Sequence, residues 1–467
     1  MILKDFTSQQ KTYLKYYAPI TLDLFLSILV EFLAVLFAAH IGPDYYVTGV
    51  GIASQVNLCT LFTIMYGYST VFECYGGPLL TLSGKTAVGL LLVKCTLQGC
   101  LVYLVTVGPY LGTIYLVPLF GDEEDVQAVA VLYIKLLAFR PILLYFRELL
   151  MRYLITMNYI FVSFAVSLFV CLPLYILLCW FTVIVMKWGL YGLALSQNGV
   201  ALIYVLLQLG FCVWKRKELD FPALEIKKVF EGWWQMVKLG ILSSLRMLAS
   251  WAMVAVVVLV CQASGPVTAT AVIILDRIQL IFNVSVYAGG YATAMLVGTA
   301  MGAQNKEQVK DAAKIGALNL FLDRAVTSLL CLAIATPAAK ALSDDPEVVA
   351  EVQDATFALI LTLILLGCDE YLARGILTPF AKQAVIAFVT PVAIYAVALP
   401  VLLYLVFVHH VEAYVYFMCI SLGYFIQCIA YIVRVCYLDV DKELDQCLER
   451  QPIRDDIGNE TTEQIEY

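Results

Sequence analysis

The stretch ELLMRYLIT, at Glu148–Thr156, returns 222 residues later as EYLARGILT, at Glu370–Thr378. Glu, Leu, Arg, two aliphatic residues and Thr keep the same order in both copies. If this likeness were chance, no other pair of segments would share its offset. Three more matches lie at an offset of 223 residues and indicate an internal duplication: GYSTVF from Gly67 with GYATAM from Gly290, IGP from Ile41 with SGP from Ser264, and Lys15 with Lys238.

The composition is that of a membrane protein. Of 467 residues, 62% are apolar and only 14% are charged, and the mean hydropathy is +0.87. A helix needs about 20 mainly apolar residues to cross a hydrocarbon core of about 30 Å. The sequence predicts twelve such spans, at about 17–41, 47–76, 87–119, 128–150, 159–186, 190–213, 233–262, 267–300, 314–341, 353–376, 384–408 and 412–437.

The basic residues orient these spans, because Lys and Arg collect in cytoplasmic loops. With the N-terminus inside, the predicted inner segments hold most of the Lys and Arg, including a cluster between residues 215 and 228. The predicted outer segments are mainly acidic where they are charged, as at Asp122–Asp125. We therefore expect a multi-pass protein with both termini in the cytoplasm, in the plasma membrane or an organelle membrane.

The duplication divides the chain into two halves of six spans each. Because six is even, both halves enter the membrane in the same direction, and the repeat is parallel. The predicted fold is all-α, with twelve transmembrane helices in two pseudo-symmetric six-helix bundles. The predicted parts are an N-terminal bundle at 1–214, a cytoplasmic linker at 215–232, a C-terminal bundle at 233–437 and an acidic cytoplasmic tail at 438–467.

Several classes of function are disfavoured by the motifs. The fourteen Cys stand singly and there are three His, so we expect no metal site. The stretch GPLLTLSGKT from Gly77 has six residues between Gly and Gly-Lys, whereas a nucleotide-binding loop needs four. We therefore expect neither an enzyme nor an ATP-driven pump, and nothing indicates nucleic-acid binding.

Longer motifs resemble those of the multidrug and toxin extrusion (MATE) family. They are VYAGGYATAMLVGTAMGAQNKEQVKDAAKIG from Val286, GYSTVFECYGG from Gly67, AHIG from Ala39, RGILTPFAKQAVIA from Arg374 and WGLYGLALSQ from Trp188. The resemblance implies an antiporter that exports organic cations or drug-like small molecules in exchange for H⁺ or Na⁺, with no other cofactor. We expect it to act as a monomer in the bilayer.

Charged groups inside the spans are the candidate binding residues, because such groups are costly unless they are paired, hydrated or functional. Burial favours the protonated form of a carboxyl group, which suits proton exchange. Glu73 matches the acid of the family's second-helix motif, whereas the seventh-helix acid falls near Ser250. The predicted substrate- or ion-binding residues are Glu73, Glu31, Asp276, Asp369, Glu370 and Asp23.

The repeated phrase also predicts a gate. Glu148 and Arg152, and likewise Glu370 and Arg374, stand four residues apart, where they can pair on one helix face. Both copies are expected where their span reaches the cytoplasm. One interpretation is that each Arg is only a positive-inside anchor; the other is that contacts between the two copies close the cytoplasmic side.

Two alternative functions remain open from the sequence. A flippase for a lipid or lipid-linked glycan would carry a basic cavity, built from Arg246, Arg277 and Arg140, to hold phosphate. A channel or receptor would move no substrate against a gradient. An acidic cavity favours cation export instead.

Overall fold

The computed structural model describes residues 2–43, 45–120, 123–221, 226–343, 345–409 and 411–449, and these residues form helices joined by short turns. Segments marked η are 3₁₀ or π turns. The first half of the chain contains α1 (Ile2–Ala38), α2 (Tyr45–Asn57), η1 (Leu58–Phe62), α3 (Thr63–Ser69), α4 (Val71–Leu82), α5 (Gly84–Gly112), η2 (Thr113–Phe120), α6 (Glu124–Leu136), α7 (Arg140–Thr156), α8 (Ile160–Val166), η3 (Ser167–Cys171), α9 (Leu172–Cys179), η4 (Trp180–Val185) and α10 (Gly189–Trp214).

The second half repeats this order after a short linker helix. It contains α11 (Ile226–Phe230), α12 (Trp233–Cys261), η5 (Gln262–Ser264), α13 (Pro266–Gly302), α14 (Lys306–Leu342), α15 (Pro346–Glu370), η6 (Tyr371–Leu377), α16 (Gln383–Pro391), η7 (Val392–Ala398), α17 (Leu399–His409), α18 (Ala413–Cys436) and α19 (Val440–Glu449).

The predicted count of twelve spans is confirmed with one change. Within the described residues, eleven helices or joined helices are long and apolar enough to cross a membrane. The twelfth is a pair, α6 and α7, which meet at an angle of 47°. The prediction at 128–150 treated this pair as one continuous helix. The bend falls just before α7, and Pro141 lies in the first turn of that helix, where its missing N–H breaks no helical hydrogen bond.

Local sequence explains where several helices begin. Asn305 accepts a hydrogen bond from the backbone N–H of Gln308 at 3.1 Å and so caps α14. Asp345 accepts one from the backbone N–H of Glu347 at 2.9 Å and caps α15, which opens with Pro346. These side chains satisfy N–H groups that have no partner within the helix.

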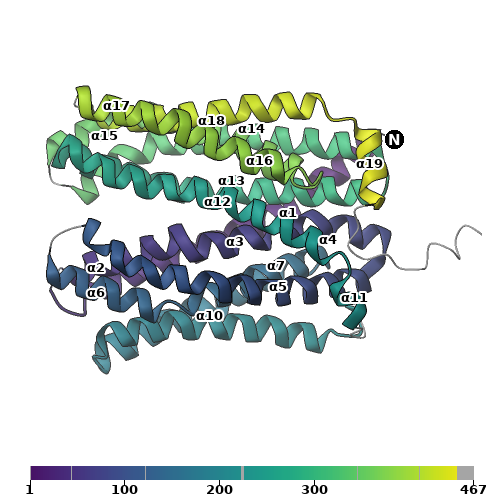
Figure 1. The fold of residues 1–467 in the computed structure, drawn as a ribbon, viewed down its shortest axis with the longest axis horizontal. Coiled ribbons are helices and arrows are strands. Elements are labelled where there is room, and N and C mark those ends of the chain that lie inside the picture. Colours follow the sequence, from purple (N-terminus) through teal and green to yellow (C-terminus); the bar gives the residue numbers. More distant parts are fainter. Residues whose placement is uncertain are drawn as a thin grey trace, which may run out of the picture.

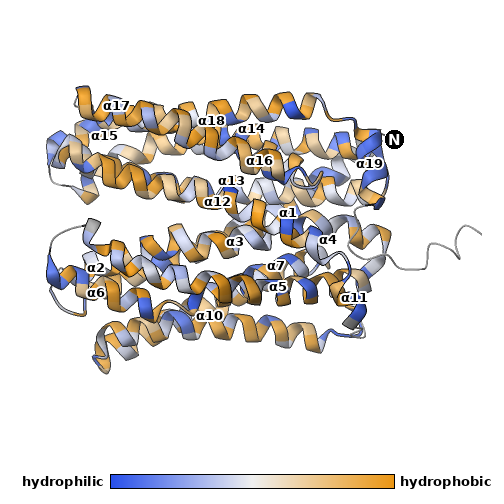
Figure 2. Cartoon of the chain, viewed as in Figure 1, coloured by the Kyte–Doolittle hydropathy of each residue, from blue (hydrophilic) through white to orange (hydrophobic). Residues whose placement is uncertain are grey.

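The two halves lie side by side as separate groups of helices (Figure 1). They lie closest near the end of the molecule that holds the start of α1, the linker helix α11 and α19, and diverge toward the other end. The largest apolar core belongs almost wholly to the first half, and a second core lies in the second half, from Met253 to Cys419. Several large apolar side chains are exposed, such as Leu104, Phe321 and Phe388, as expected of lipid-facing positions. Hydrophobic residues predominate along most of the helices (Figure 2).

Glycines allow the halves to touch. A Cβ atom added to Gly67 on α3 would lie 2.6 Å from Cα of Ser244 on α12. One added to Gly302 at the end of α13 would lie 2.8 Å from Cα of Pro78 on α4. Since real Cβ atoms do not approach backbone so closely, only glycine permits these two helix contacts, the same principle by which small residues pack transmembrane helices.

Helix α1 contacts both halves. Gln10 exchanges hydrogen bonds with Asn319 of α14 at 2.9 and 3.0 Å, and Tyr17 donates to Oδ1 of Asp323 at 2.8 Å. Beyond Pro19, which interrupts the helix ladder, Asp23 and Glu31 pair instead with the first half. The predicted N-terminal bundle of 1–214 thus includes a helix whose start packs on the other bundle.

The segment after α18 forms the amphipathic helix α19. Lys382 forms an ion pair with Glu443 at 2.6 Å, and Gln304 donates to the carbonyl of Leu444 at 3.1 Å. Leu444 and Cys447 are buried against the end of α13. The rest of the predicted acidic tail, from residue 450, lies outside the described residues.

Candidate functional site

A buried ion cluster joins the two halves. Glu73, in the first turn of α4, accepts a hydrogen bond from Nε of Arg374 on η6 at 2.9 Å and a second one from Nη2. Arg152 on α7 approaches the same carboxylate at 3.2 Å and donates to the hydroxyl of Ser69. Glu73, Arg152 and Arg374 are each at most 3% exposed. One carboxylate therefore lies between the two arginines of the repeated phrase.

Aromatic rings flank these arginines. The guanidinium carbon of Arg152 lies 5.1 Å from the ring centre of Tyr66, and that of Arg374 lies 5.7 Å from the rings of both Tyr66 and Tyr291. These distances are within cation–π range, and a ring face attracts a cation more strongly when water is excluded. Both guanidinium groups that contact Glu73 therefore also lie near aromatic rings.

A second cluster lies within the first half. Nη2 of Arg147 on α7 lies 2.7 Å from Oδ2 of Asp23 on α1. Asp23 also accepts hydrogen bonds from Ser167 and, at 3.4 Å, from Tyr204. Glu148 lies 4.0 Å from Arg147 and 3.9 Å from Arg152. Each acid in this cluster has at least one guanidinium group beside it.

A third cluster lies within the second half and has fewer cations. Nη2 of Arg246 on α12 contacts Glu370 at 2.7 Å and Asp369 at 3.2 Å. All three residues are buried. Oδ1 of Asp369 and Oε2 of Glu370 are enclosed and have no hydrogen-bond partner among the described residues. Two neighbouring carboxylates thus share one guanidinium group.

The three clusters together carry one surplus negative charge when all groups are ionised. They contain the acids Asp23, Glu73, Glu148, Asp369 and Glu370 against the bases Arg147, Arg152, Arg246 and Arg374. A buried charge without a partner is strongly unfavourable. A bound cation or a proton would remove this imbalance.

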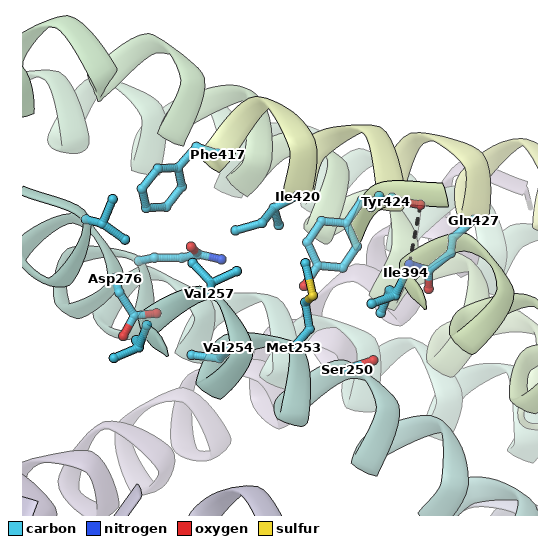
Figure 3. Close-up of a pocket in the computed structure, with 15 residues that line it drawn as sticks. Ser250, Met253, Val254, Val257, Asp276, Ile394, Phe417, Ile420, Tyr424 and Gln427 are labelled. Atoms are coloured by element: carbon cyan, nitrogen blue, oxygen red, sulfur yellow. Dashed lines mark hydrogen bonds between the residues drawn. The ribbon is translucent and has the colours of Figure 1, made fainter. Parts of the chain in front are cut away.

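A cavity of about 40 Å³ lies inside the second half, and Asp276 lines it (Figure 3). This volume accommodates roughly three water molecules. Asp276 on α13 faces it from one side, with Ser250 on α12 and Tyr424 and Gln427 on α18 also contributing to the lining. Within the described chain, no Lys or Arg lies within 4 Å of the Asp276 carboxylate in an ion pair.

The predicted binding residues therefore fall into several sites. Glu73 lies between the halves, Asp369 and Glu370 lie together in the second half, and Asp276 lines the cavity. Asp23 is in the first half with Arg147, and the half-exposed Glu31 pairs with Arg140. The six acids do not form one common pocket.

The predicted pairing within each copy is found in only one of the two copies, and the gate itself stays a prediction. Glu148 and Arg152 do pair within α7, but they are buried rather than solvated. Glu370 and Arg374, both described, form no ion pair within 4 Å of each other. The reason is that η6 is a π-helix, whose wider turn rotates Arg374 away from Glu370 and toward Glu73.

Sequence reasoning missed the aromatic and hydroxyl partners of the charged groups. Tyr66, Tyr291, Ser69 and Tyr204 occur among many similar residues along the spans, and no local pattern singles them out. The doubling of Gly67-Tyr68 at Gly290-Tyr291 was visible and marked the right helices. It carried no information on which charge each ring would face.

Comparisons with known proteins agree on one family. The family model MatE matches residues 243–404. Multidrug and toxin extrusion protein 1 of Xenopus tropicalis is 24% identical over 407 residues, covering 84% of this chain and 67% of that protein. Protein DETOXIFICATION 34 of Arabidopsis thaliana is 22% identical over 396 residues, covering 82% and 70%.

Solved structures share the fold. The crystal structure of the eukaryotic MATE transporter AtDTX14 superimposes with a TM-score of 0.88 at 17% identity, over 96% of this chain and 99% of that one. A MOP superfamily transporter from Pyrococcus furiosus superimposes with a TM-score of 0.78 at 14% identity, over 94% and 96%. The fold is that of a multi-pass membrane transporter built from two helix bundles. By family model, by sequence and by fold, the chain is similar to transporters of the multidrug and toxin extrusion family.

Proposed function

We propose that this protein is an ion-coupled antiporter that exports organic cations by alternating access, with H⁺ or Na⁺ as the coupling ion. The observation that carries the proposal is Asp276, a carboxylate that lines the cavity of the second half without an ion-pair partner among the described residues. An acid without an ion-pair partner in a small, mainly apolar cavity attracts a cation or a proton, and it can release that cation or proton again.

The basic-cavity alternative has less support. Two of the three arginines that would build it are neutralised: Arg246 by Asp369 and Glu370, and Arg140 by Glu31. Only Arg277 remains exposed without an ion pair among the described residues. A phosphate-bearing lipid or lipid-linked glycan would therefore meet one free cation and several acids.

The proposal is tested with purified protein in proteoliposomes. Export of a fluorescent organic cation is followed under an imposed pH gradient, an imposed Na⁺ gradient, or neither. We expect transport to need one of the two gradients and Asp276→Asn to abolish the coupled component. Asp311→Asn, which changes a surface acid of the same half paired with Lys314, is the matched control. Equal flux without any gradient would instead indicate a channel.

Orientation in the membrane is part of the same proposal. We place the linker, both termini and the close end of the two halves in the cytoplasm, because the Lys and Arg of the loops gather there. We also propose that the protein acts as a monomer. Cysteine labelling of intact cells should reach a cysteine placed at Glu412 but not one at Lys217, and the reverse result would invert the topology.

A further inference from the structure

The repeated phrase adopts two different backbone conformations. In α7, Glu148 and Arg152 stand four residues apart on a regular helix and lie 3.9 Å from each other. In the second copy, the π-helix η6 begins directly after Glu370 and contains Arg374. A return of η6 to α-helical geometry would bring Arg374 back over Glu370, because residues four apart then share a face. Arg374 therefore has two carboxylates within reach, Glu73 of the first half and Glu370 of its own copy.

Arg374 also decides which half holds the surplus negative charge. Without it, the first half has Asp23, Glu73 and Glu148 against two arginines, and the second half has Asp369 and Glu370 against one. Each half is then short of one positive charge. In this structure Arg374 compensates the first half, so the surplus charge stays with Asp369 and Glu370 in the second half. Among the described acids of the clusters, enclosed oxygens without a hydrogen-bond partner occur on Asp369 and Glu370, and also on Glu148 of the first half.

The place that Arg374 occupies has the features of a cation site. It offers the carboxylate of Glu73 and the ring faces of Tyr66 and Tyr291. Gly290 leaves room for the arginine stem, since a Cβ atom there would lie 3.4 Å from Cδ of Arg374. An organic cation would find the same carboxylate and the same rings if the arginine moved away.

We propose that Arg374 moves between Glu73 and Glu370, and that an organic cation binds at Glu73, between the rings of Tyr66 and Tyr291, only after Arg374 has left. The identity of the ligand as cargo rests on the proposed function. In this structure the site is closed, because the arginine of the protein itself fills it. When Arg374 pairs with Glu370, the surplus negative charge moves to the first half. The bound cation then takes the place of the Arg374 guanidinium group beside Glu73 and neutralises this charge.

The movement also couples the site to the position of the two halves. The contact of Glu73 with Arg374 joins α4 to η6, and α4 lies toward the end of the molecule where the halves are closest (Figure 1). Its loss removes a buried bidentate ion pair from the interface. Binding of the cation therefore favours separation of the halves at the end that holds the start of α1.

Spin labels measure this separation in the full-length protein in lipid nanodiscs. One label replaces Lys85 at the start of α5 and one replaces Gln308 on α14, both exposed at the close end, with the exposed Cys436 changed to Ser. Glu73→Gln removes the present partner and should shift the distances to longer values. Glu370→Gln removes the other partner and should leave only the short distances. Asp311→Asn is the control and should change neither.

Binding of tetraethylammonium to the same samples tests the ligand site. We expect Glu370→Gln to weaken binding about tenfold or more, because Arg374 then has no other partner. Tyr66→Leu should weaken it about threefold to tenfold, the size of a lost cation–π contact. Arg374→Lys keeps the positive charge but loses the bidentate contact with Glu73, so it should lengthen the distances between the spin labels. This variant replaces a Gln variant that fails to fold.

The outcomes separate the two proposals. If Glu73→Gln and Glu370→Gln shift the distances in the same direction, or not at all, the switch is wrong even where cation export is observed. If the distances shift in opposite directions but tetraethylammonium neither binds nor is exported, the movement of Arg374 stands and the cation site at Glu73 is wrong. If Glu370→Gln binds tetraethylammonium as tightly as the unchanged protein does, Arg374 does not compete with the cation for the site at Glu73.

Discussion

The two halves of the molecule hold the same buried ion pair with its charges exchanged. In the first half Asp23 on α1 meets Arg147 on α7, and in the second half Arg246 on α12 meets Asp369 on α15. The repeat places Asp23 opposite Arg246, at an offset of 223, and Arg147 opposite Asp369, at an offset of 222. Both pairs join the first helix of a half to the helix that carries the repeated phrase.

The exchange shows that the duplicated fold requires a pair at this place but not a fixed polarity. A buried pair is costly to break, because removing one partner leaves the other uncompensated. Both charges must therefore change together, and the geometry between the two helices accepts either order. The acid next in sequence stays the same in both halves, as Glu148 and Glu370. The reversal thus gives the second half two adjacent acids where the first half has Arg and Glu.

The largest expected effect comes from removing the arginine of each pair. Arg246→Ala leaves Asp369 and Glu370 without a cation, whereas after Arg147→Ala Asp23 keeps its hydroxyl donors and Glu148 keeps Arg152. Both should lose stability by about 3–5 kcal/mol, with Arg246→Ala the more severe. Thermal unfolding, monitored by fluorescence-detected gel filtration, measures the difference in stability between the two variants.

A charge exchange sharpens the same comparison. The double variant with Arg246→Asp and Asp369→Arg gives the second half the polarity of the first. We expect it to recover most of the stability that Arg246→Ala loses. A double variant no more stable than either single change would show that the second half accepts only its own polarity.

An intermediate effect is expected at the matched glycines Gly67 and Gly290. A Cβ atom at Gly67 would lie 2.6 Å from backbone of α12, whereas one at Gly290 would meet Arg374 and Glu370 at 3.4 Å. Gly67→Ala should therefore cost about 1–3 kcal/mol of stability through overpacking, and Gly290→Ala should cost clearly less. Equal melting temperatures for the two variants would contradict the asymmetry of the interface.

The smallest effect is expected where each half holds a segment that lies outside the membrane spans. Hydrogen bonds from Lys215 and Tyr159 hold the pKa of the linker residue Glu218 below its usual value of 4.5. Its contribution to stability is thus present above that value and is lost as the pH falls through the lowered pKa. Glu218→Gln should change the melting temperature at pH 7 less than Glu443→Gln, because the Glu443 pair with Lys382 is largely buried. A larger change for Glu218 would show that the linker contributes more than a surface contact.

Most of the fold could be predicted from the sequence. Runs of about 20 apolar residues indicate the number of spans, and four matches at offsets of 222 or 223 residues indicate the duplication. The break between α6 and α7 escaped because the apolar run continues across it. The packing of the start of α1 on the second half escaped for another reason: Gln10 and Tyr17 find their partners more than 300 residues away.

The candidate site was predicted only in part. Each acid named from the sequence lies on a helix of the structure, and several are buried. Which arginine each acid pairs with could not be predicted from the spacing of the residues. Helical spacing brings Glu148 and Arg152 together and would do the same for Glu370 and Arg374. In the second copy the π-helix changes this spacing, so residues four apart no longer share one face. No pattern in the residues from Tyr371 to Leu377 predicts the π-helix.

The sequence by itself determined that this protein spans a membrane many times, in two related halves, because hydrophobic length and repetition are local and countable properties. Tertiary structure alone decided which charge meets which. A guanidinium group within the membrane pairs with whichever carboxylate its helix packing brings within about 3–4 Å. Arg374 therefore meets Glu73 across the interface instead of Glu370 beside it in the chain.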